Sequence, residues 1–509
     1  MGRRWFCLSA YLACMCHESA WSWPRVVVFA LGLALVAGGT GLGQAPTTKQ
    51  PWTYLLLNDG TLIDDCPVCG RPTILEPMRG TFQLRLLESN SLFSRYAVEN
   101  ISFTAGSTRH YRVTGAGTFQ IGGEVAVVQQ MSLQVRIDDG FTNRLCYLTN
   151  APAAPGRPWP MIDISLEPTN GTVTQQYSLR LAAAPVREIW FSTVSRFTTA
   201  AGPTTFVGGG VLLSTSGRIV KRNADLFTSV GAFPPSPDLG LDAVDILPGG
   251  EIAFSLVSDI TSTTLGQLHH GDLLSTRGRI LRRNQDLLAP FGVMPTTPEV
   301  GLDAVQVLDS GEILFSIATD IFSERLGVTL HRGDLLSSNG RVERSQQKLV
   351  SRFHPPKPAT ADYGLDALHL WPGGEIWFST EQGFQDAVLG PILEGDLLSD
   401  QGYIVFRNLE LLNAFAPIED PPSFGLDALY VVTDAIAPAP APRLNIAADP
   451  TTRGASLTWK GQGRVFQILR ADAVTGPFEP LSAILPDLTF DDPGALTNRT
   501  QGFYGLHQW

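Results

Sequence analysis

Alternation of apolar and polar residues dominates the part of the chain that follows its N-terminal region. Residues 82–86 and 131–137 alternate strictly, and a period of two residues is typical of half-buried antiparallel strands. Short apolar runs at 54–57 and 61–63 flank an Asn-Asp-Gly turn, which is a β-hairpin signal. Residues 50–185 are therefore predicted to form one β domain, either a sandwich or a barrel.

A second pattern is a unit that repeats after about 62 residues, and a fixed period of this size indicates a repeat architecture. The tetrapeptide Gly-Leu-Asp-Ala opens four apolar runs, at Gly240–Ala243, Gly301–Ala304, Gly364–Ala367 and Gly425–Ala428. Each unit adds three further strand-like runs, of the types Glu-Ile-x-Phe-Ser, Gly-Asp-Leu-Leu-Ser and Arg-Ile. Residues 186–434 are therefore predicted to contain four units of four strands.

The two ends of the repeat array indicate how the units are arranged. The first unit begins at Glu188 without a good Gly-Leu-Asp-Ala strand before it, and the last ends with an orphan strand, Gly425–Val432. In a ring, the orphan strand completes the first sheet, and the exposed edges of an open β array disappear. We therefore expect a four-bladed β-propeller, with a linear β stack as the competing arrangement.

An Ala/Pro-rich linker, residues 435–442, leads to a third small β segment, residues 443–509. Its alternating strands, the core candidate Trp459 and the closing run Gly502–Leu506 resemble the fibronectin type III-like modules of secreted bacterial proteins. The repeat units resemble a family of bacterial extracellular propeller-like repeats, through Leu365–Leu368, Phe378-Ser379 and Gly395–Leu397. This second resemblance implies a fold and export but no particular reaction.

The N-terminus and the composition place the protein outside the cell. Arg25, the apolar run Val26–Ala37 and the small residues after it predict a signal peptide region over residues 1–45. No transmembrane segment is predicted after cleavage, so we expect a secreted or cell-surface protein. A net charge of −11 without any Lys/Arg block gives no support for nucleic-acid binding.

Three of the six cysteines follow the signal region: Cys66, Cys69 and Cys146. The spacing of Cys66 and Cys69 is that of half a zinc knuckle, but the second half is missing. In an exported chain we favour a local disulfide between these two residues. Cys146 is then left unpaired, or it pairs with one of them.

Repeated polar residues are the first candidates for chemistry. Two sets are interpreted as structural, because a buried carboxylate must be paired or hydrogen-bonded and the serine one strand over is a candidate partner. These sets are Asp242, Asp303, Asp366 and Asp427, and Ser192, Ser255, Ser316 and Ser379. A further set, Asp272, Asp334 and Asp396, supplies candidate calcium ligands, because calcium prefers oxygen ligands. The first unit carries Val211 at that position, which weakens a symmetric ring of ligands, and no other cofactor is predicted.

Other residues are candidates for recognition. His269, His270 and His331 precede the Gly-Asp pairs of two units, and we interpret them as exposed loop residues, with metal binding as the alternative. Loops on a rigid scaffold commonly carry function. Four stretches differ in content while their flanks repeat: Thr193–Gly208, Ser258–Leu268, Ala318–His331 and Glu381–Leu393.

The sequence contains no Gly-x-Ser-x-Gly, His-Glu-x-x-His, EF-hand or phosphate-binding motif. We therefore favour a non-catalytic extracellular binding or adhesion protein that uses the propeller as a recognition platform, with a polysaccharide or an extracellular protein as partner. One alternative is a secreted carbohydrate-active enzyme, a hydrolase or a lyase, since two suitably spaced carboxylates suffice for a glycosidase. The other alternative is a structural envelope protein.

Overall fold

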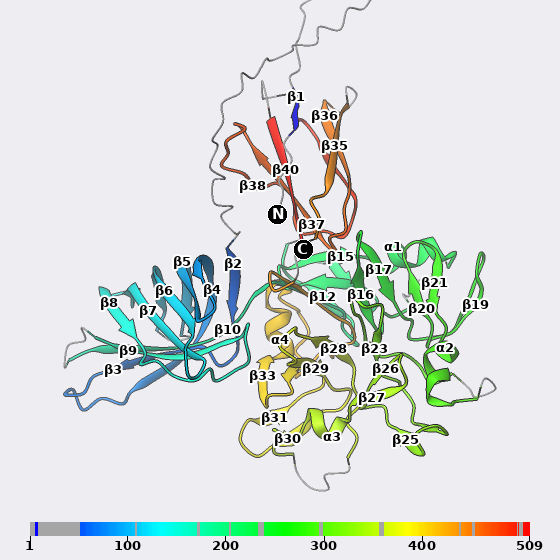
Figure 1. The fold of residues 1–509 in the computed structure, drawn as a ribbon, viewed down its shortest axis with the longest axis horizontal. Helices are drawn as coiled ribbons and strands as arrows, with labels where there is room; N and C mark the ends of the chain where they lie inside the picture. The colour runs from blue at the N-terminus through cyan, green and yellow to red at the C-terminus, as the bar shows by residue number, and fades with distance from the viewer. Residues whose placement is uncertain are drawn as a thin grey trace, which may run out of the picture.

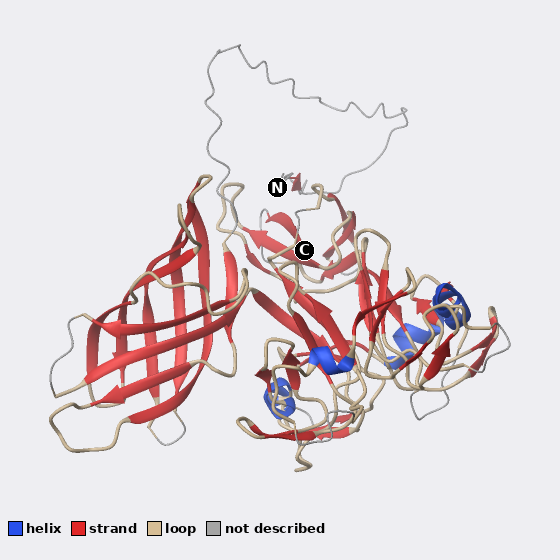
Figure 2. Ribbon diagram, turned by 60° about the horizontal axis from the view of Figure 1, so that its bottom comes forward, coloured by secondary structure: helices blue, strands red, loops and turns tan. Residues whose placement is uncertain are grey.

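The computed structural model is almost entirely β, which confirms the predicted all-β class (Figure 1, Figure 2). Three units follow one another along the chain: a barrel in blue and cyan, a ring of four sheets in green and yellow, and a two-sheet sandwich in orange and red. The structure describes residues 6–8, 51–106, 109–169, 174–202, 205–232, 239–294, 299–355, 361–436, 439–449, 453–495, 497 and 502–509. Apart from residues 6–8, the predicted signal region lies outside the described residues.

The first unit is a closed barrel rather than a sandwich. Its strands are β2 (Trp52–Leu56), β3 (Thr61–Asp65), β4 (Ile74–Ser89), β5 (Phe93–Ala105), β6 (Tyr111–Gly122), β7 (Val128–Asp138), β8 (Asn143–Thr149), β9 (Ile162–Pro168) and β10 (Gln176–Ala184). From β4 to β10 each strand pairs with the next, and β10 also pairs with β3 and β2, which closes the sheet. The apolar residues of the alternating strands, such as Met131 and Val135, fill the interior.

The second unit consists of four antiparallel sheets of four strands. The first sheet contains β34 (Leu429–Thr433), β11 (Val186–Phe191), β14 (Leu212–Ser214) and β15 (Arg218–Lys221). The second contains β16 (Val244–Leu247), β17 (Glu251–Phe254), β20 (Leu273–Ser275) and β21 (Arg279–Arg282). The third contains β22 (Val305–Val307), β23 (Ile313–Phe315), β26 (Leu335–Ser337) and β27 (Arg341–Arg344). The fourth contains β28 (Ala367–Leu370), β29 (Ile376–Ser379), β32 (Leu397–Ser399) and β33 (Tyr403–Phe406).

The sheets form a closed ring and not a linear stack. Strand β34 pairs with β11, with Val432 opposite Glu188, which confirms that the orphan strand completes the first sheet. The first strand of each sheet, which we call the inner strand, contacts its neighbours in the order β34, β16, β22, β28 and back to β34. These pairings are the ones that the predicted four-bladed arrangement requires.

Each unit of the ring also contains small elements that the sequence pattern did not indicate. Two-stranded hairpins follow the second strands: β12 (Phe197–Thr199) with β13 (Thr205–Val207), β18 (Ile260–Ser262) with β19 (Gly266–Leu268), β24 (Ile321–Ser323) with β25 (Val328–Leu330), and β30 (Phe384–Asp386) with β31 (Gly390–Ile392). Short helices follow the outermost strands: α1 (Asn223–Phe227), α2 (Asn284–Leu288), α3 (Gln346–Leu349) and α4 (Asn408–Leu411), with 3-10 turns η1 (Thr228–Val230), η2 (Ala289–Phe291) and η3 (Asn413–Phe415). The hairpins fall inside the four variable stretches.

One serine in each unit ties its sheet to the next unit. The serine hydroxyl donates to the carbonyl of the leucine that precedes the repeated aspartate, at 2.7–3.0 Å. The four pairs are Ser192 with Leu241, Ser255 with Leu302, Ser316 with Leu365, and Ser379 with Leu426. All four serines are fully buried, so these bonds hold the ring together where water cannot replace them.

The third unit is a sandwich of two sheets. One sheet contains β35 (Arg443–Asp449), β36 (Gly454–Lys460) and β39 (Thr489–Asp492); the other contains β38 (Glu479–Pro480), β37 (Phe466–Ala471), β40 (Gly502–Gln508) and β1 (Phe6–Leu8). Trp459 is buried between the sheets. The three units meet at Asp434, whose carboxylate accepts hydrogen bonds from Thr53 of the barrel, Arg187 of the ring and Trp509 of the sandwich.

Candidate functional site

The inner strands give the ring two distinct ends. Strand β16 pairs Val244 with Phe254 at one end and Leu247 with Glu251 at the other. The repeated aspartates and the hairpins lie at the first end, which we call the loop end. At the second end the Gly249 amide donates to the Gly463 carbonyl of the sandwich at 2.8 Å, and we call it the sandwich end.

Four carboxylates gather at the loop end: Asp303, Asp366 and Asp427 are buried, and Asp242 is half-buried. Burial raises the pKa of each of them, to about 8 for Asp303 and about 7 for Asp427. The negative charges of the other members also raise the pKa of Asp242 and Asp366. Within the described part of the chain, no hydrogen bond or ion pair reaches these side chains. The predicted pairing of each aspartate with a serine is not formed, because each serine donates to a leucine carbonyl instead.

The calcium candidates Asp272, Asp334 and Asp396 connect two segments within their own units. In each, Oδ2 accepts from the amide three residues earlier at 3.0–3.1 Å, and Oδ1 accepts from the amide that opens the short helix at 3.0–3.3 Å. Arg283 and Arg407 add ion pairs to Asp272 and Asp396 at 2.6–2.7 Å. These bonds give the three carboxylates a structural role, and calcium binding by them stays a prediction.

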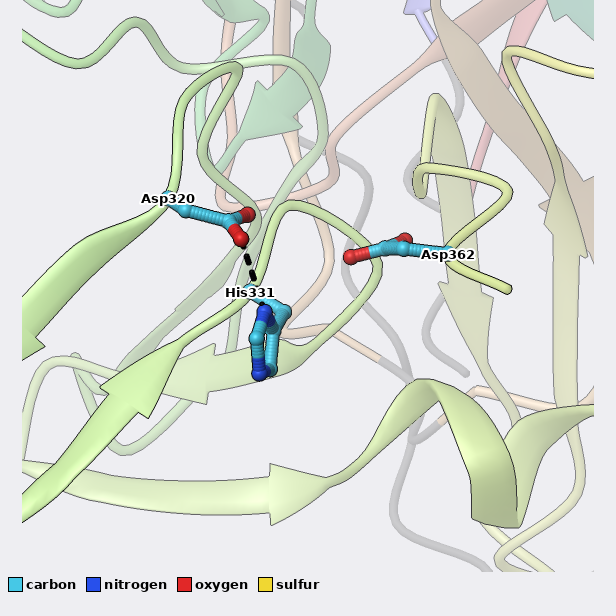
Figure 3. A group of neighbouring side chains, drawn as sticks. All are labelled: Asp320, His331 and Asp362. Atoms are coloured by element: carbon cyan, nitrogen blue, oxygen red, sulfur yellow. Dashed lines mark hydrogen bonds and ion pairs between the residues drawn. The ribbon is translucent and has the colours of Figure 1, made fainter. Parts of the chain in front are cut away.

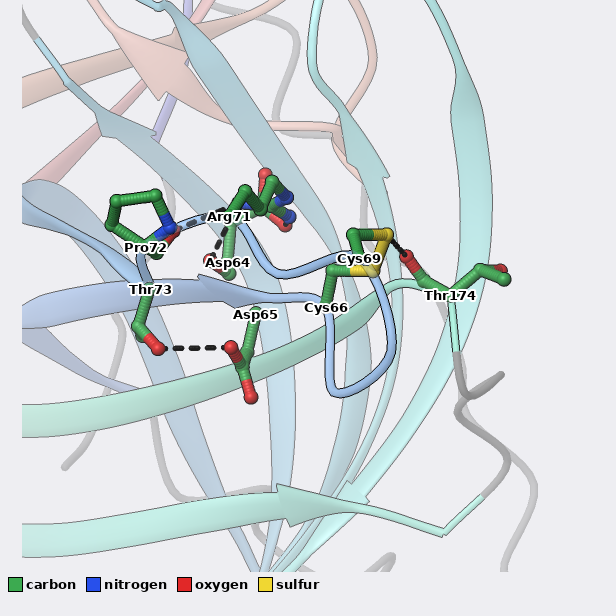
Figure 4. The surroundings of a disulfide bond; sticks show 8 residues. All are labelled: Asp64, Asp65, Cys66, Cys69, Arg71, Pro72, Thr73 and Thr174. Carbon is green, nitrogen blue, oxygen red and sulfur yellow. Dashed lines mark hydrogen bonds and ion pairs between the residues drawn. A yellow bond between two sulfur atoms is a disulfide. The ribbon is translucent and has the colours of Figure 1, made fainter.

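The barrel contains the disulfide candidate. Cys66 and Cys69 are joined in the structure, in the turn that follows β3, and Figure 4 shows their surroundings. Thr73 Oγ1 donates to Asp65 Oδ1 at 2.9 Å beside this turn. Cys146 is a free, buried thiol. The disulfide therefore stabilises a turn of the barrel. Most of the barrel sequence separates it from the ring.

The sandwich end of the ring holds a cleft of about 950 Å³. All four inner strands line it, together with Arg464 and Trp509 from the sandwich. Small-molecule sites commonly have volumes of about 300–1,000 Å³ and often lie between domains. This cleft is our candidate functional site, and the sequence analysis did not identify it.

One polar residue from each inner strand borders the cleft, three positions after the repeated aspartate. These residues are Asp245, Gln306, His369 and Tyr430. The same four strands thus carry an identical residue at the loop end and four different residues at the sandwich end. A comparison of the variable positions among the repeats could have found this set, since a polar residue recurs there in an otherwise apolar strand.

Two of the four side chains bind the next inner strand. Asp245 Oδ2 accepts from the Val307 amide at 2.7 Å, and Gln306 Oε1 accepts from the Leu370 amide at 2.6 Å. Asp245 is buried, which raises its pKa to about 6 despite the opposing charge of Arg464 at 3.5 Å. These two residues therefore fix the shape of the cleft.

Arg464 is the contribution of the sandwich to the cleft wall. Its guanidinium donates to the carbonyls of Ile246 and Val307, at 2.6 and 3.1 Å, and pairs with Asp309 at 2.9 Å. The positive charge is thus matched by two aspartates, Asp245 and Asp309. The cleft consequently offers no unmatched positive charge to a ligand at this position.

Three other polar groups at the cleft have no partner among the described residues. The Nε2 atom of His369 and the Nε1 atom of Trp371 are shielded and unpaired. The Tyr430 hydroxyl also makes no hydrogen bond within the described part of the chain. Burial and the Arg464 charge lower the pKa of His369 to about 3, so its imidazole is neutral at pH 7. The unpartnered groups are therefore uncharged donors and acceptors beside aromatic rings.

Three tryptophans of the ring, Trp190, Trp371 and Trp377, are buried in the core, whereas Phe322 is half exposed on its hairpin. The predicted loop histidines all contact aspartates. His269 and His270 both contact Asp259, and His331 contacts Asp320, all at the loop end. No helix among the described residues is long and apolar enough to cross a membrane.

Comparisons with known proteins add little. No protein-family model and no curated protein matches the chain. Two solved structures show weak likeness: extracellular domains of two putative hybrid two-component systems from B. thetaiotaomicron. The first is 8% identical, with 87% of this chain and 82% of that chain covered and a TM-score of 0.20. The second is 9% identical, with 82% and 74% covered and a TM-score of 0.17. Scores this low carry no argument about fold or function.

Proposed function

We propose that the chain is an exported, non-catalytic binding protein. The ring is its recognition platform, and the cleft at the sandwich end takes an uncharged, hydroxyl-rich ligand such as the end of a polysaccharide chain. One observation carries this proposal: of the four polar side chains that the inner strands present to the cleft, Asp245 and Gln306 bind the next inner strand, whereas His369 Nε2 and the Tyr430 hydroxyl have no hydrogen-bond partner among the described residues. Export rests on the predicted signal peptide region.

The chemistry of the cleft favours a sugar over an ion. Sugar hydroxyls donate and accept hydrogen bonds, as the unpartnered Tyr430 hydroxyl requires, whereas His369 Nε2 and Trp371 Nε1 are shielded within the cleft wall. Tyr430 and Trp509 border the cleft and contribute the small exposed part of their aromatic rings, which can contact the apolar face of a sugar. An anionic ligand would lose its hydration without gaining a counter-ion, because Arg464 is already paired with two carboxylates.

The experiment is a panel of soluble and insoluble polysaccharides, with retention of the mature protein and release of sugars scored together. We expect retention without products. Released products would overturn the non-catalytic assignment and favour the carbohydrate-active enzyme. If neither occurs, the cleft is not a sugar site.

A single variant connects retention with the cleft. Tyr430→Phe removes one hydroxyl and keeps the ring, so the affinity for the retained polysaccharide should fall about 2- to 13-fold, the value of one hydrogen bond. The matched control is Tyr147→Phe on the exposed barrel surface, which should bind as the wild type does. Equal loss in both variants would contradict the assignment of the site.

A further inference from the structure

Outside the cleft, a second cluster of ligand-type side chains lies at the loop end, in the third unit of the ring. Asp320, His331 and Asp362 each offer one ligand atom, and these atoms all lie within 4.8 Å of one another. Figure 3 shows the two carboxylates on either side of the imidazole, with Asp320 hydrogen-bonded to it. Asp320 directly precedes the hairpin strand β24, and His331 directly follows its partner β25. Asp362 lies in the segment before the inner strand β28.

We propose that Asp320, His331 and Asp362 bind a divalent first-row transition metal, with zinc as the representative ion. One imidazole nitrogen and two carboxylate oxygens are ligands that such ions accept, at about 2.0–2.2 Å for zinc. Calcium is a poorer match, because it prefers an all-oxygen set of six to eight ligands. Three protein ligands leave further coordination positions open to water or to a donor from a partner.

The backbone already holds both carboxylates in place. Asp320 Oδ1 accepts from the Arg332 amide at 3.0 Å, which leaves Oδ2 directed at His331 Nδ1, 2.8 Å away. Asp362 Oδ1 accepts from the Gly364 amide at 2.9 Å. Such outer hydrogen bonds orient metal ligands and lower the entropy lost on binding. Asp320 and His331 are about half exposed, so they can make the small adjustment that coordination needs.

The nearest cation does not compete for these carboxylates. The Arg332 guanidinium pairs with Glu381 at 2.8 Å and donates to the Asp362 carbonyl at 3.3 Å. Its charge is therefore matched by a carboxylate outside the cluster. The two aspartates of the cluster keep their negative charge for an ion.

The neighbouring unit carries a related set of residues. At the positions of Asp320, His331 and Asp362, the second unit carries Asp259, His269 and Glu299. Glu299 Oε2 is shielded and has no hydrogen-bond partner among the described residues. The fourth unit has Gly383, Leu393 and Ser423 at these positions. Metal-type residues are thus present together in two units and absent together in the fourth, and the first unit carries only one of them, Asp238, with Arg196 and Gly208 at the other two positions.

The test is calorimetric titration of the full mature chain with zinc chloride. His331→Gln should remove one binding event, or weaken it at least about tenfold, while the variant keeps the wild-type melting temperature. The matched control is His354→Gln, since His354 is another exposed histidine near a carboxylate, Asp386 at 3.8 Å, outside the cluster. This control should titrate as the wild type does.

A second measurement distinguishes metal binding at the proposed site from metal binding in the second unit. With cobalt(II) as the probe, the visible absorption bands of a nitrogen- and oxygen-ligated ion should lose the contribution of one site in His331→Gln and in Asp320→Asn. The double variant His269→Gln/His270→Gln should retain that contribution. Unchanged zinc stoichiometry and affinity in His331→Gln, or no binding by the wild type up to about 1 mM, a weak limit for any specific site, would overturn the proposal.

Discussion

The two ends of the same four inner strands follow opposite rules. At the loop end, every unit carries the same residue, an aspartate, and the four carboxylates repel one another without hydrogen bonds from the described residues. At the sandwich end, each unit carries a different polar residue, and a cleft opens there. The difference teaches that positions which serve the symmetric scaffold carry the same residue in every repeat. Positions that contact a single asymmetric ligand must carry different residues.

The largest effect should come from the side chain that connects the sandwich to the ring. Arg464→Met leaves the buried Asp245 without its counter-charge, and breaking a buried pair costs about 3–5 kcal/mol. We expect a lower melting temperature by calorimetry. The double variant Arg464→Met/Asp245→Asn should recover part of the loss, because the unmatched charge is then gone.

The matched control for this comparison is Arg282→Met, since Arg282 is exposed and donates to the adjacent Leu281 carbonyl. It should change the free energy of unfolding by less than about 0.5 kcal/mol. An Arg464 variant as stable as this control would show that the sandwich is not held at the cleft by this ion pair.

The next effect concerns the bonds that close the ring. Ser255→Ala leaves the buried Leu302 carbonyl without its donor, and an unsatisfied buried group costs about 1–3 kcal/mol. Ser258→Ala, three residues away on the surface, is the control and should be nearly neutral. Denaturation of both variants by urea compares them; equal stability would contradict the role assigned to the repeated serines.

The loop-end aspartates should destabilise the fold at high pH. In the folded protein Asp303 has a pKa of about 8, against an ordinary aspartate value of 3.8 in the unfolded chain. Between these values the folded state binds more protons than the unfolded state, so the free energy of unfolding falls as the pH rises from about 4 to 8.

Asp303→Asn should remove the contribution of this group to that pH dependence and stabilise the protein at pH 8 by up to about 5 kcal/mol, since the two pKa values differ by about four units and one unit corresponds to about 1.4 kcal/mol. At pH 4 the variant and the wild type should be nearly equal. The difference between their melting curves isolates this group from the histidines that titrate in the same range. A variant that is less stable than the wild type at pH 8 would show that the aspartates bind a stabilising partner.

The sequence predicted the repeated parts of the fold and missed the parts that do not repeat. The repeated Gly-Leu-Asp-Ala and Glu-Ile-x-Phe-Ser runs predicted the four sheets. The orphan strand that ends at Val432 predicted that the ring closes. Helices such as α1 were missed, because five residues are too few to show a helical period. The barrel was one of two alternatives, since alternation along a strand does not say whether β10 returns to β3.

The site was less predictable for a physical reason. Arg464 reaches the cleft from a separate domain, and no local pattern connects it with Asp245, 219 positions earlier in the chain. His369 and Tyr430 differ from their counterparts in the other units, so a search for shared residues passes over them. The loop-end aspartates, which do repeat, were found at once, but the hydrogen bonds expected for them are not formed.

The central claim is that the ligand binds where the repeats diverge. Hydrogen exchange of the full mature chain, with and without a soluble fragment of the retained polysaccharide, tests it most directly. We predict slower exchange at the cleft ends of the inner strands, around residues 245–247, 306–308, 369–371 and 430–433, and no change in the loop-end hairpins. Protection confined to the hairpins at 197–207, 260–268, 321–330 and 384–392 would contradict the account and return recognition to the loops.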